Sequence, residues 1–146
     1  MKKAYIFGAI LIILGLIVAI APWTFAPVCE VHTAENPNGL WIVTSSGKLM
    51  PMPCGYTARA EIGVGALLVI LGGLAALFLT AGNKLVMGIM GISVGGLVIA
   101  LPTVLTGMCA MSSHPCRTTT EPVLILLGVV VIIVSLVVIL YKPKVK

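Results

Sequence analysis

Long apolar stretches alternate with short polar segments along this chain. Four of them are each about 20 residues long and have no charged residue near the middle: 4–25, 60–81, 85–105 and 122–141. A helix needs about 20 mostly apolar residues to cross the hydrocarbon core of a bilayer. The pattern therefore predicts an all-α membrane protein, a four-transmembrane-helix bundle formed by one domain over residues 1–146.

The composition indicates that lipid is the solvent of this chain. Hydrophobic residues make up 60% of the sequence and charged residues 9%, which is more apolar surface than a small soluble fold can bury. The net charge of +5 does not indicate nucleic-acid binding, because the lysines lie at the ends of the apolar stretches and not on one face. The lipid bilayer is therefore the first expected partner.

The distribution of basic residues predicts the orientation in the cell membrane. Six lysines flank the apolar stretches on one side, in segments without acidic residues: Lys2, Lys3, Lys84, Lys142, Lys144 and Lys146. The opposite side holds only Lys48, Arg59 and Arg117 as basic residues. Because positively charged flanks stay in the cytoplasm, we expect both termini to be cytoplasmic. Residues 26–59 and 106–121 are then the outer, extracytoplasmic loops.

All four cysteines fall in these outer loops, at Cys29, Cys54, Cys109 and Cys116. An even number of cysteines in an oxidising compartment is typical of disulfide bonds. Three pairings are possible, one with a bridge inside each loop and two that tie the loops together, and the sequence leaves all three open. Bridges of this kind would stabilise loops that have no core of their own.

The first outer loop predicts a small β-hairpin. Residues 40–44 and 48–50 are mostly apolar, with β-branched residues in the first run, and they flank the turn sequence Ser45-Ser46-Gly47. With the cysteines, the pattern predicts a disulfide-braced extracytoplasmic β-hairpin cap. The candidate partner-binding residues are Trp41, Met50, Met52 and Tyr56, because aromatic residues and Met are enriched in protein interfaces. The alternative for these four residues is burial under the cap or a position at the lipid surface.

Small residues at helical spacing predict close helix packing. Gly72-x-x-x-Ala76 and Gly91-x-x-x-Gly95 are small-xxx-small patterns, and we expect them to be seams inside the bundle rather than a dimer interface. Pro102 is expected to kink the third helix and to free a backbone carbonyl. The capping-box pattern from Thr118 to Glu121 predicts that the fourth helix starts at Pro122.

Charged residues collect at the outer ends of the second and fourth stretches. Arg59 and Glu61 are two positions apart, so they point to different faces of one helix. Arg117 and Glu121 are four apart and can pair with each other, and an Arg117–Glu61 pair across helices is a further expected arrangement. The four residues are candidates for a polar network at the membrane mouth.

Two kinds of chemistry are alternatives to a purely structural role for the outer loops. Thioether, thiolate and imidazole ligands suit Cu(I), and the candidate ligands are Met108, Cys109, Met111, His114 and Cys116, with "MPMPC" nearby. Four spans with two outer cysteine pairs also match the layout of membrane thiol–quinone oxidoreductases. The chain has no C-x-x-C pair, the usual arrangement of a reactive dithiol. We therefore favour a non-enzymatic protein, with no catalytic residue, no cofactor and no resident metal.

Two stretches resemble an uncharacterised family of small four-span membrane proteins, known mainly from bacteria as a domain of unknown function. They are "PCGYTARAEIGVGALLVILG" and "PTVLTGMCAMSSHPCRTTTEPVLILLG". The matching positions are Cys54, Thr57, Ala58, Ala60, Glu61, Gly63, Cys109 and Cys116. Such genes often lie near those of ABC-type transporters, so the resemblance implies an accessory or interaction subunit. Other membrane protein subunits, or a homo-oligomer, are then the expected protein partners.

Overall fold

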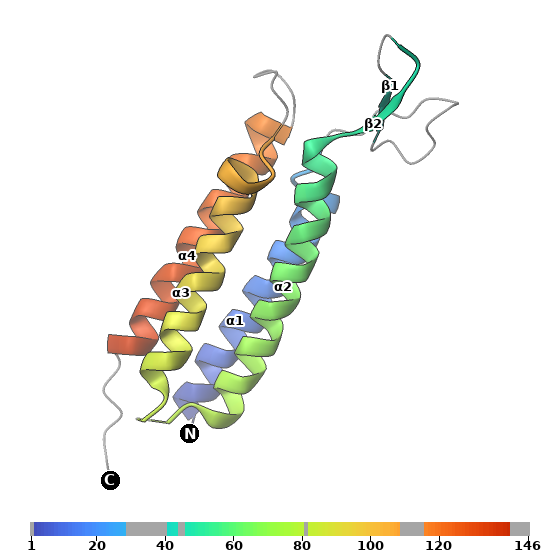
Figure 1. The fold of residues 1–146 in the computed structure, drawn as a ribbon. Helices are drawn as coiled ribbons and strands as arrows, with labels where there is room; N and C mark the ends of the chain where they lie inside the picture. The colour runs from blue at the N-terminus through green and yellow to red at the C-terminus, as the bar shows by residue number, and fades with distance from the viewer. Residues whose placement is uncertain (1, 29–40, 44–45, 81, 109–115, 141–146) are drawn as a thin grey trace.

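The computed structural model describes residues 2–28, 41–43, 46–80, 82–108 and 116–140. Four long helices stand side by side (Figure 1): α1 (Lys2–Ile20), α2 (Pro53–Phe78), α3 (Lys84–Ala100) and α4 (Glu121–Leu140). The start of α1, the end of α4 and the connection from α2 to α3 lie at one end of the bundle. Strands β1 (Trp41–Val43) and β2 (Leu49–Pro51) lie at the other end, which we name the hairpin end.

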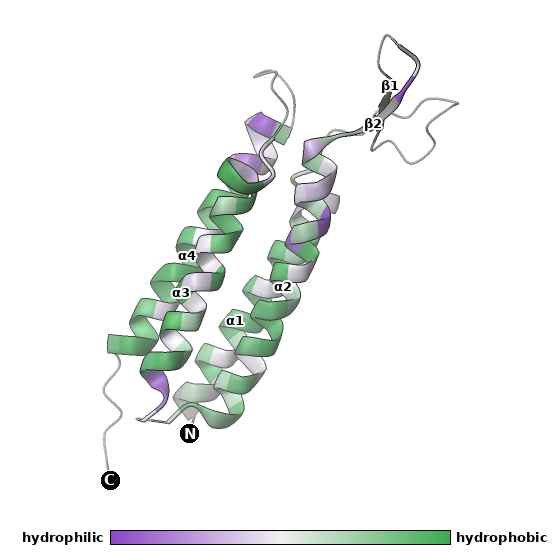
Figure 2. Cartoon of the chain, in the orientation of Figure 1, coloured by the Kyte–Doolittle hydropathy of each residue, from purple (hydrophilic) through white to green (hydrophobic). Residues whose placement is uncertain are grey.

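The four-span fold predicted from the sequence is confirmed. Within the described part of the chain, four helical segments are long and apolar enough to cross a membrane: Ala4–Trp23, Pro53–Phe78, Lys84–Leu105 and Cys116–Leu140. Hydrophobic residues run along the length of each helix, and the strongly hydrophilic positions lie toward the helix ends (Figure 2). Many large apolar side chains face outward, as expected for a surface solvated by lipid.

Short helical turns of other types lengthen three of these segments. A 3₁₀ turn, η1 (Ala21–Trp23), follows α1, a π turn, η2 (Leu101–Leu105), follows α3, and a second π turn, η3 (Cys116–Thr120), precedes α4. Proline lacks an amide hydrogen and its ring opposes regular α-helical turns. Pro102 lies within η2, so the predicted distortion of the third span is present as a π turn.

Two helical segments begin before the residues predicted for their spans. The second span starts at Pro53 and not at residue 60, because the fixed φ angle of proline suits the first helical turn. The fourth α-helix begins at Glu121, one residue before the predicted start at Pro122, and the π turn η3 extends this helical segment back to Cys116. Cys54 and Cys116 therefore lie on the first turns of two spans and not in loops.

The two strands are three residues each and pair antiparallel. Trp41 faces Pro51 across the pair, Ile42 faces Met50, and Val43 faces Leu49. Gly47, in the turn between the strands, has a φ of 76°, a conformation that residues with a Cβ rarely adopt. The turn therefore depends on glycine at this position.

The helices associate as two close pairs, α1 with α2 and α3 with α4. Between α1 and α2, a Cβ on Gly72 would lie 2.7 Å from the carbonyl oxygen of Gly8 and 2.8 Å from the amide nitrogen of Ile12. Between α3 and α4, a Cβ on Gly95 would lie 3.1 Å from the carbonyl oxygen of Gly128. Backbones meet this closely only where side chains are missing, so both predicted small-residue seams lie inside the bundle.

A shared apolar core joins the two pairs. Each of the four helices contributes buried side chains to it, mostly from the half nearer the hairpin end. Its buried members are Leu14, Val18, Ala21, Val64, Leu68, Val98, Leu101, Leu124, Leu127 and Val131.

Candidate functional site

Glu61 is the most unusual side chain of the described chain. It lies on α2 near the hairpin end, has 0% exposure, and neither carboxyl oxygen has a hydrogen-bond partner among the described residues. Thr57, Val64 and Leu68 share its buried helix face, at spacings of three or four residues. Arg59, two positions away, is exposed. The prediction that Arg59 and Glu61 point to different faces is confirmed.

Thr57 lies one turn before Glu61 and connects α2 to the end of the third span. Its Oγ1 is 2.6 Å from Thr106 Oγ1 and donates to the carbonyl oxygen of Gly107 at 3.0 Å. The π turn η2 sets up this contact, because the amides of Thr106 and Gly107 both donate to Leu101 O, at 3.1 and 3.2 Å. Thr106 is exposed, so a pair of hydroxyl groups leads from the buried face of α2 to the surface.

Thr120 makes the equivalent connection between the other two spans. It is fully buried just before α4, and its Oγ1 lies 3.0 Å from the carbonyl oxygens of both Ala26 and Pro27. Thr57 and Thr120 thus each join one helix pair to the other at the hairpin end. No local sequence pattern predicts the contacts of Thr106 and Thr120, whereas the position of Thr57 one turn before Glu61 is visible in the sequence.

Four sulfur-containing residues meet at the same end. Cys54 and Cys116 are fully buried in one cluster with Met52, Val28 and Ala58, and Met108 packs against it. Met52 is buried at 3% exposure, which agrees with the alternative of burial at this position, and its role in partner binding stays a prediction. The remaining predicted cysteines and metal-ligand candidates lie outside the described residues: Cys29, Cys109, Met111 and His114.

The predicted Arg117–Glu61 pair is not formed. Arg117 Nε lies 3.9 Å from Glu121 Oε2, and both side chains are on the surface of the fourth span. One helical turn brings these two residues together, whereas Glu61 faces the core. An exposed pair of this kind contributes little to stability. Because Arg117 lies near Glu121, its charge does not compensate that of Glu61.

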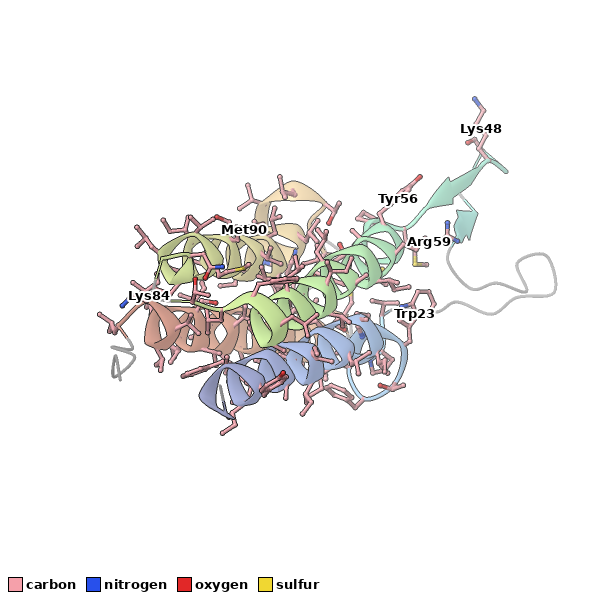
Figure 3. The ribbon with its side chains drawn as sticks, turned by 90° about the horizontal axis from the view of Figure 1, so that it is seen from below. Trp23, Lys48, Tyr56, Arg59, Lys84 and Met90 are labelled. Carbon is pink, nitrogen blue, oxygen red and sulfur yellow. The ribbon has the colours of Figure 1, made fainter. Side chains whose placement is uncertain are left out.

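Exposed aromatic and basic side chains collect around the hairpin end (Figure 3). Tyr56 is 52% exposed and Trp23 is 41% exposed, and Arg59 lies one turn after Tyr56 on the same face of α2. The backbones of Trp41 and Met50 lie in β1 and β2, and their side chains are outside the described part of the structure. Among the described residues, no three His, Cys, Asp or Glu side chains are grouped so as to hold a metal ion.

The comparison with protein families decides what this chain is related to. A family model described as "Domain of unknown function (DUF4418)" matches residues 11–141. The chain belongs to this family. The DUF4418 match covers the second, third and fourth spans, most of the first, and every residue of the site described above, so the buried Glu61 and the two threonine contacts lie within the family's domain. No match is found among the curated proteins or the solved structures.

Proposed function

We propose that this protein is a non-enzymatic integral membrane subunit whose hairpin end contacts another membrane protein. The observation that supports the proposal is the exposed face of α2, where Tyr56 and Arg59 lie one turn apart, with the exposed Trp23 also at the hairpin end (Figure 3). Tyr, Trp and Arg are the residues that most often dominate binding at interfaces. In our proposal, Arg59 pairs with an acidic group of the partner.

The partner class that we favour is the permease of an ABC-type transporter, in line with the family resemblance. A lipid headgroup could also receive Tyr56 and Trp23, because aromatic side chains are enriched where a bilayer meets water. In our proposal the protein lies in the cell membrane with the hairpin end outside and both termini in the cytoplasm. Lys84, at the end of the bundle opposite to Lys48 (Figure 3), supports that orientation.

We also propose that the four cysteines form two disulfide bonds at the hairpin end. Cys54 and Cys116 lie in one buried cluster. Val28 and Met108, which directly precede Cys29 and Cys109, pack in or against the same cluster. Bridges at this point would hold together the outer ends of all four spans. Alkylation followed by mass spectrometry of the unreduced protein checks this, and four alkylated cysteines would exclude it.

The two chemical alternatives make different predictions for the same cysteines. A thiol–quinone oxidoreductase must exchange electrons with a substrate thiol, but Cys54 and Cys116 are fully buried, which opposes attack. A Cu(I) protein would use thioether and thiolate sulfur atoms, and Met52 and Met108 do lie beside the two cysteines. Metal analysis of the protein purified under reducing conditions separates this alternative from the subunit proposal.

In-cell photocrosslinking tests the subunit proposal. A photoreactive amino acid replaces Tyr56 in one variant and Met90 in a matched control, because Met90 is similarly exposed at 48% but lies on α3 away from the hairpin end (Figure 3). We expect a protein adduct at position 56, which Arg59→Glu weakens, and none at position 90. Lipid adducts alone at position 56, or the same protein adduct at both positions, would contradict the proposal.

A further inference from the structure

The burial of Glu61 requires an explanation beyond packing. A carboxylate in an apolar environment is costly unless it is paired or hydrogen-bonded, and both oxygens of Glu61 lack a partner among the described residues. Val64 and Leu68 follow Glu61 on the same buried face of α2, and both are apolar. Unsatisfied buried polar atoms are rare in native proteins, so packing alone does not explain a carboxyl group at this position.

Among the described residues, no charged or titratable group on a neighbouring element forms a hydrogen bond with Glu61. Lys2, Lys3 and Tyr5 of α1 and Lys84 of α3 lie at the opposite end of the bundle. The π turn η2 contains no titratable residue. At the start of the fourth span, Arg117 pairs with Glu121, and Cys116 is buried in the sulfur cluster. On α2 itself, Tyr56 and Arg59 are exposed, and Cys54 lies in that same cluster.

Among the described residues on this face of α2, polar side chains lie on one side of Glu61 only. Toward the hairpin end, Thr57 follows one turn away, and its hydroxyl contacts that of the exposed Thr106 at 2.6 Å. Toward the other end, the same face of α2 continues with Val64, Leu68 and Leu71, which are all buried and apolar. The hydroxyl groups of Thr57 and Thr106 thus lie on the side of Glu61 that faces the hairpin end, and apolar side chains lie on its other side.

We propose that Glu61 is a proton-binding site, loaded and unloaded at the hairpin end through the hydroxyl groups of Thr57 and Thr106. In loading, a hydronium ion at the surface gives a proton to Thr106 and becomes water, and Thr106 gives its own proton to Thr57. Because Thr57 has no hydrogen bond to Glu61, the proposal includes one bridging water, which takes the proton of Thr57 and gives one of its own to the carboxylate. Each hydroxyl and the bridging water take up one proton and release one, so the positive charge of the hydronium ion neutralises the carboxylate of Glu61.

This assignment gives the bundle a response to acidity on one side of the membrane. Glu61 lies on the face of α2 that carries the Thr57 contact between the two helix pairs. Loss of the proton leaves a negative charge at this point, which attracts water. Deprotonation of Glu61 therefore affects the Thr57 contact that holds the helix pairs together. The inference does not depend on the proposed subunit function, because it uses no partner.

Carbodiimide labelling of the full chain in lipid vesicles tests whether the site holds a proton. Dicyclohexylcarbodiimide enters membranes and adds as an intact molecule to a protonated carboxyl group. We expect mass spectrometry to find it on Glu61, with a yield that falls as the pH is raised, and the label to disappear in Glu61→Gln. Glu121, paired at the surface, is the internal control. Absence of label from Glu61 at every pH would overturn the proposal, and this readout needs no variant.

Hydrogen–deuterium exchange of the same carboxyl group tests the route. The infrared carbonyl band of Glu61 is assigned by its loss in Glu61→Gln, or by its shift in Glu61→Asp if the first variant does not fold. We expect Thr57→Val to slow deuteration of this band several-fold and Thr57→Ser, which keeps the hydroxyl, to restore it. Thr120→Val is the matched control, because it removes an equally buried hydroxyl that also joins the helix pairs. Equal slowing in Thr120→Val, or none in Thr57→Val, would overturn the route.

Discussion

Buried polar side chains at the hairpin end are of two kinds. Thr57 and Thr120 are fully buried, and each finds oxygen atoms of another span within about hydrogen-bond distance. Glu61 is equally buried but has no such partner among the described residues. The threonines therefore stabilise the contact between helix pairs, whereas a buried carboxyl group without a partner reduces stability.

Replacing Glu61 by an apolar residue of similar size is expected to stabilise the fold. Glu61→Met removes the unsatisfied oxygens and keeps an unbranched side chain, so we expect the free energy of unfolding to rise by about 1–2 kcal/mol. Thermal unfolding in one detergent, followed by circular dichroism, measures the change. Glu121→Gln, which breaks only the surface pair, is the control and should change stability by less than about 1 kcal/mol. A lower midpoint for Glu61→Met would contradict this prediction.

At the scale of helices, glycines determine which faces can meet. Gly72 and Gly73 are adjacent on α2 but have opposite surroundings. A Cβ on Gly72 would collide with the backbone of α1, whereas a Cβ on Gly73 would meet no atom within 4 Å. Close packing, and not helix formation, is therefore what requires glycine at position 72.

This pair of neighbours provides a matched test of the α1–α2 seam. We expect Gly72→Ala to destabilise the protein by about 1–3 kcal/mol, because the obstructing atoms belong to the backbone of Gly8 and Ile12 and cannot move aside. Gly73→Ala should leave the unfolding midpoint unchanged or slightly higher, since alanine favours helix. The same comparison holds for Gly95→Ala and Gly96→Ala on α3, where only the first meets α4. Equal effects within either pair would contradict the packing explanation.

On the scale of the whole molecule, the bundle consists of two close helix pairs that share one core. Glycine seams hold each pair together along its length, while the contacts of Thr57 and Thr120 join the pairs near the hairpin end. The shared apolar core also lies mostly toward that end. The end nearest the α2–α3 connection has fewer such links, so we expect the pairs to separate there first.

The orientation in the membrane can be tested at the two ends of the bundle. An epitope inserted after Gly47 should bind its antibody on intact cells, because Gly47 lies in the exposed turn at the hairpin end. An epitope after Gly82, in the exposed connection between α2 and α3, should bind only after permeabilisation. The charge bias gives the physical reason, since lysine-rich flanks stay in the cytoplasm. Binding at Gly82 on intact cells would reverse the topology.

The sequence alone determined the number of spans, the faces of Arg59 and Glu61, and the glycine seams. Each of these depends on a property that repeats along one helix: apolar length, helical spacing, or the absence of side chains. The start of α2 at Pro53 also follows a local rule, but the predicted boundary at residue 60 relied on apolarity alone. Apolarity does not mark where a helix begins when its first turns lie in the polar outer zone.

Only the tertiary structure decided which buried polar groups meet. Thr57 and Thr106 are 49 positions apart and Thr120 and Ala26 are 94 apart, so no local pattern encodes either contact. Opposite charges predicted an Arg117–Glu61 pair, but the helix face of Glu61 turns it into the core while Arg117 stays on the surface with Glu121. Hydrophobicity and charge are properties of single residues. The hydrogen-bond or ion-pair partner of a side chain instead depends on how separate helices are rotated against one another. Close packing of backbones at the glycine seams fixes that rotation.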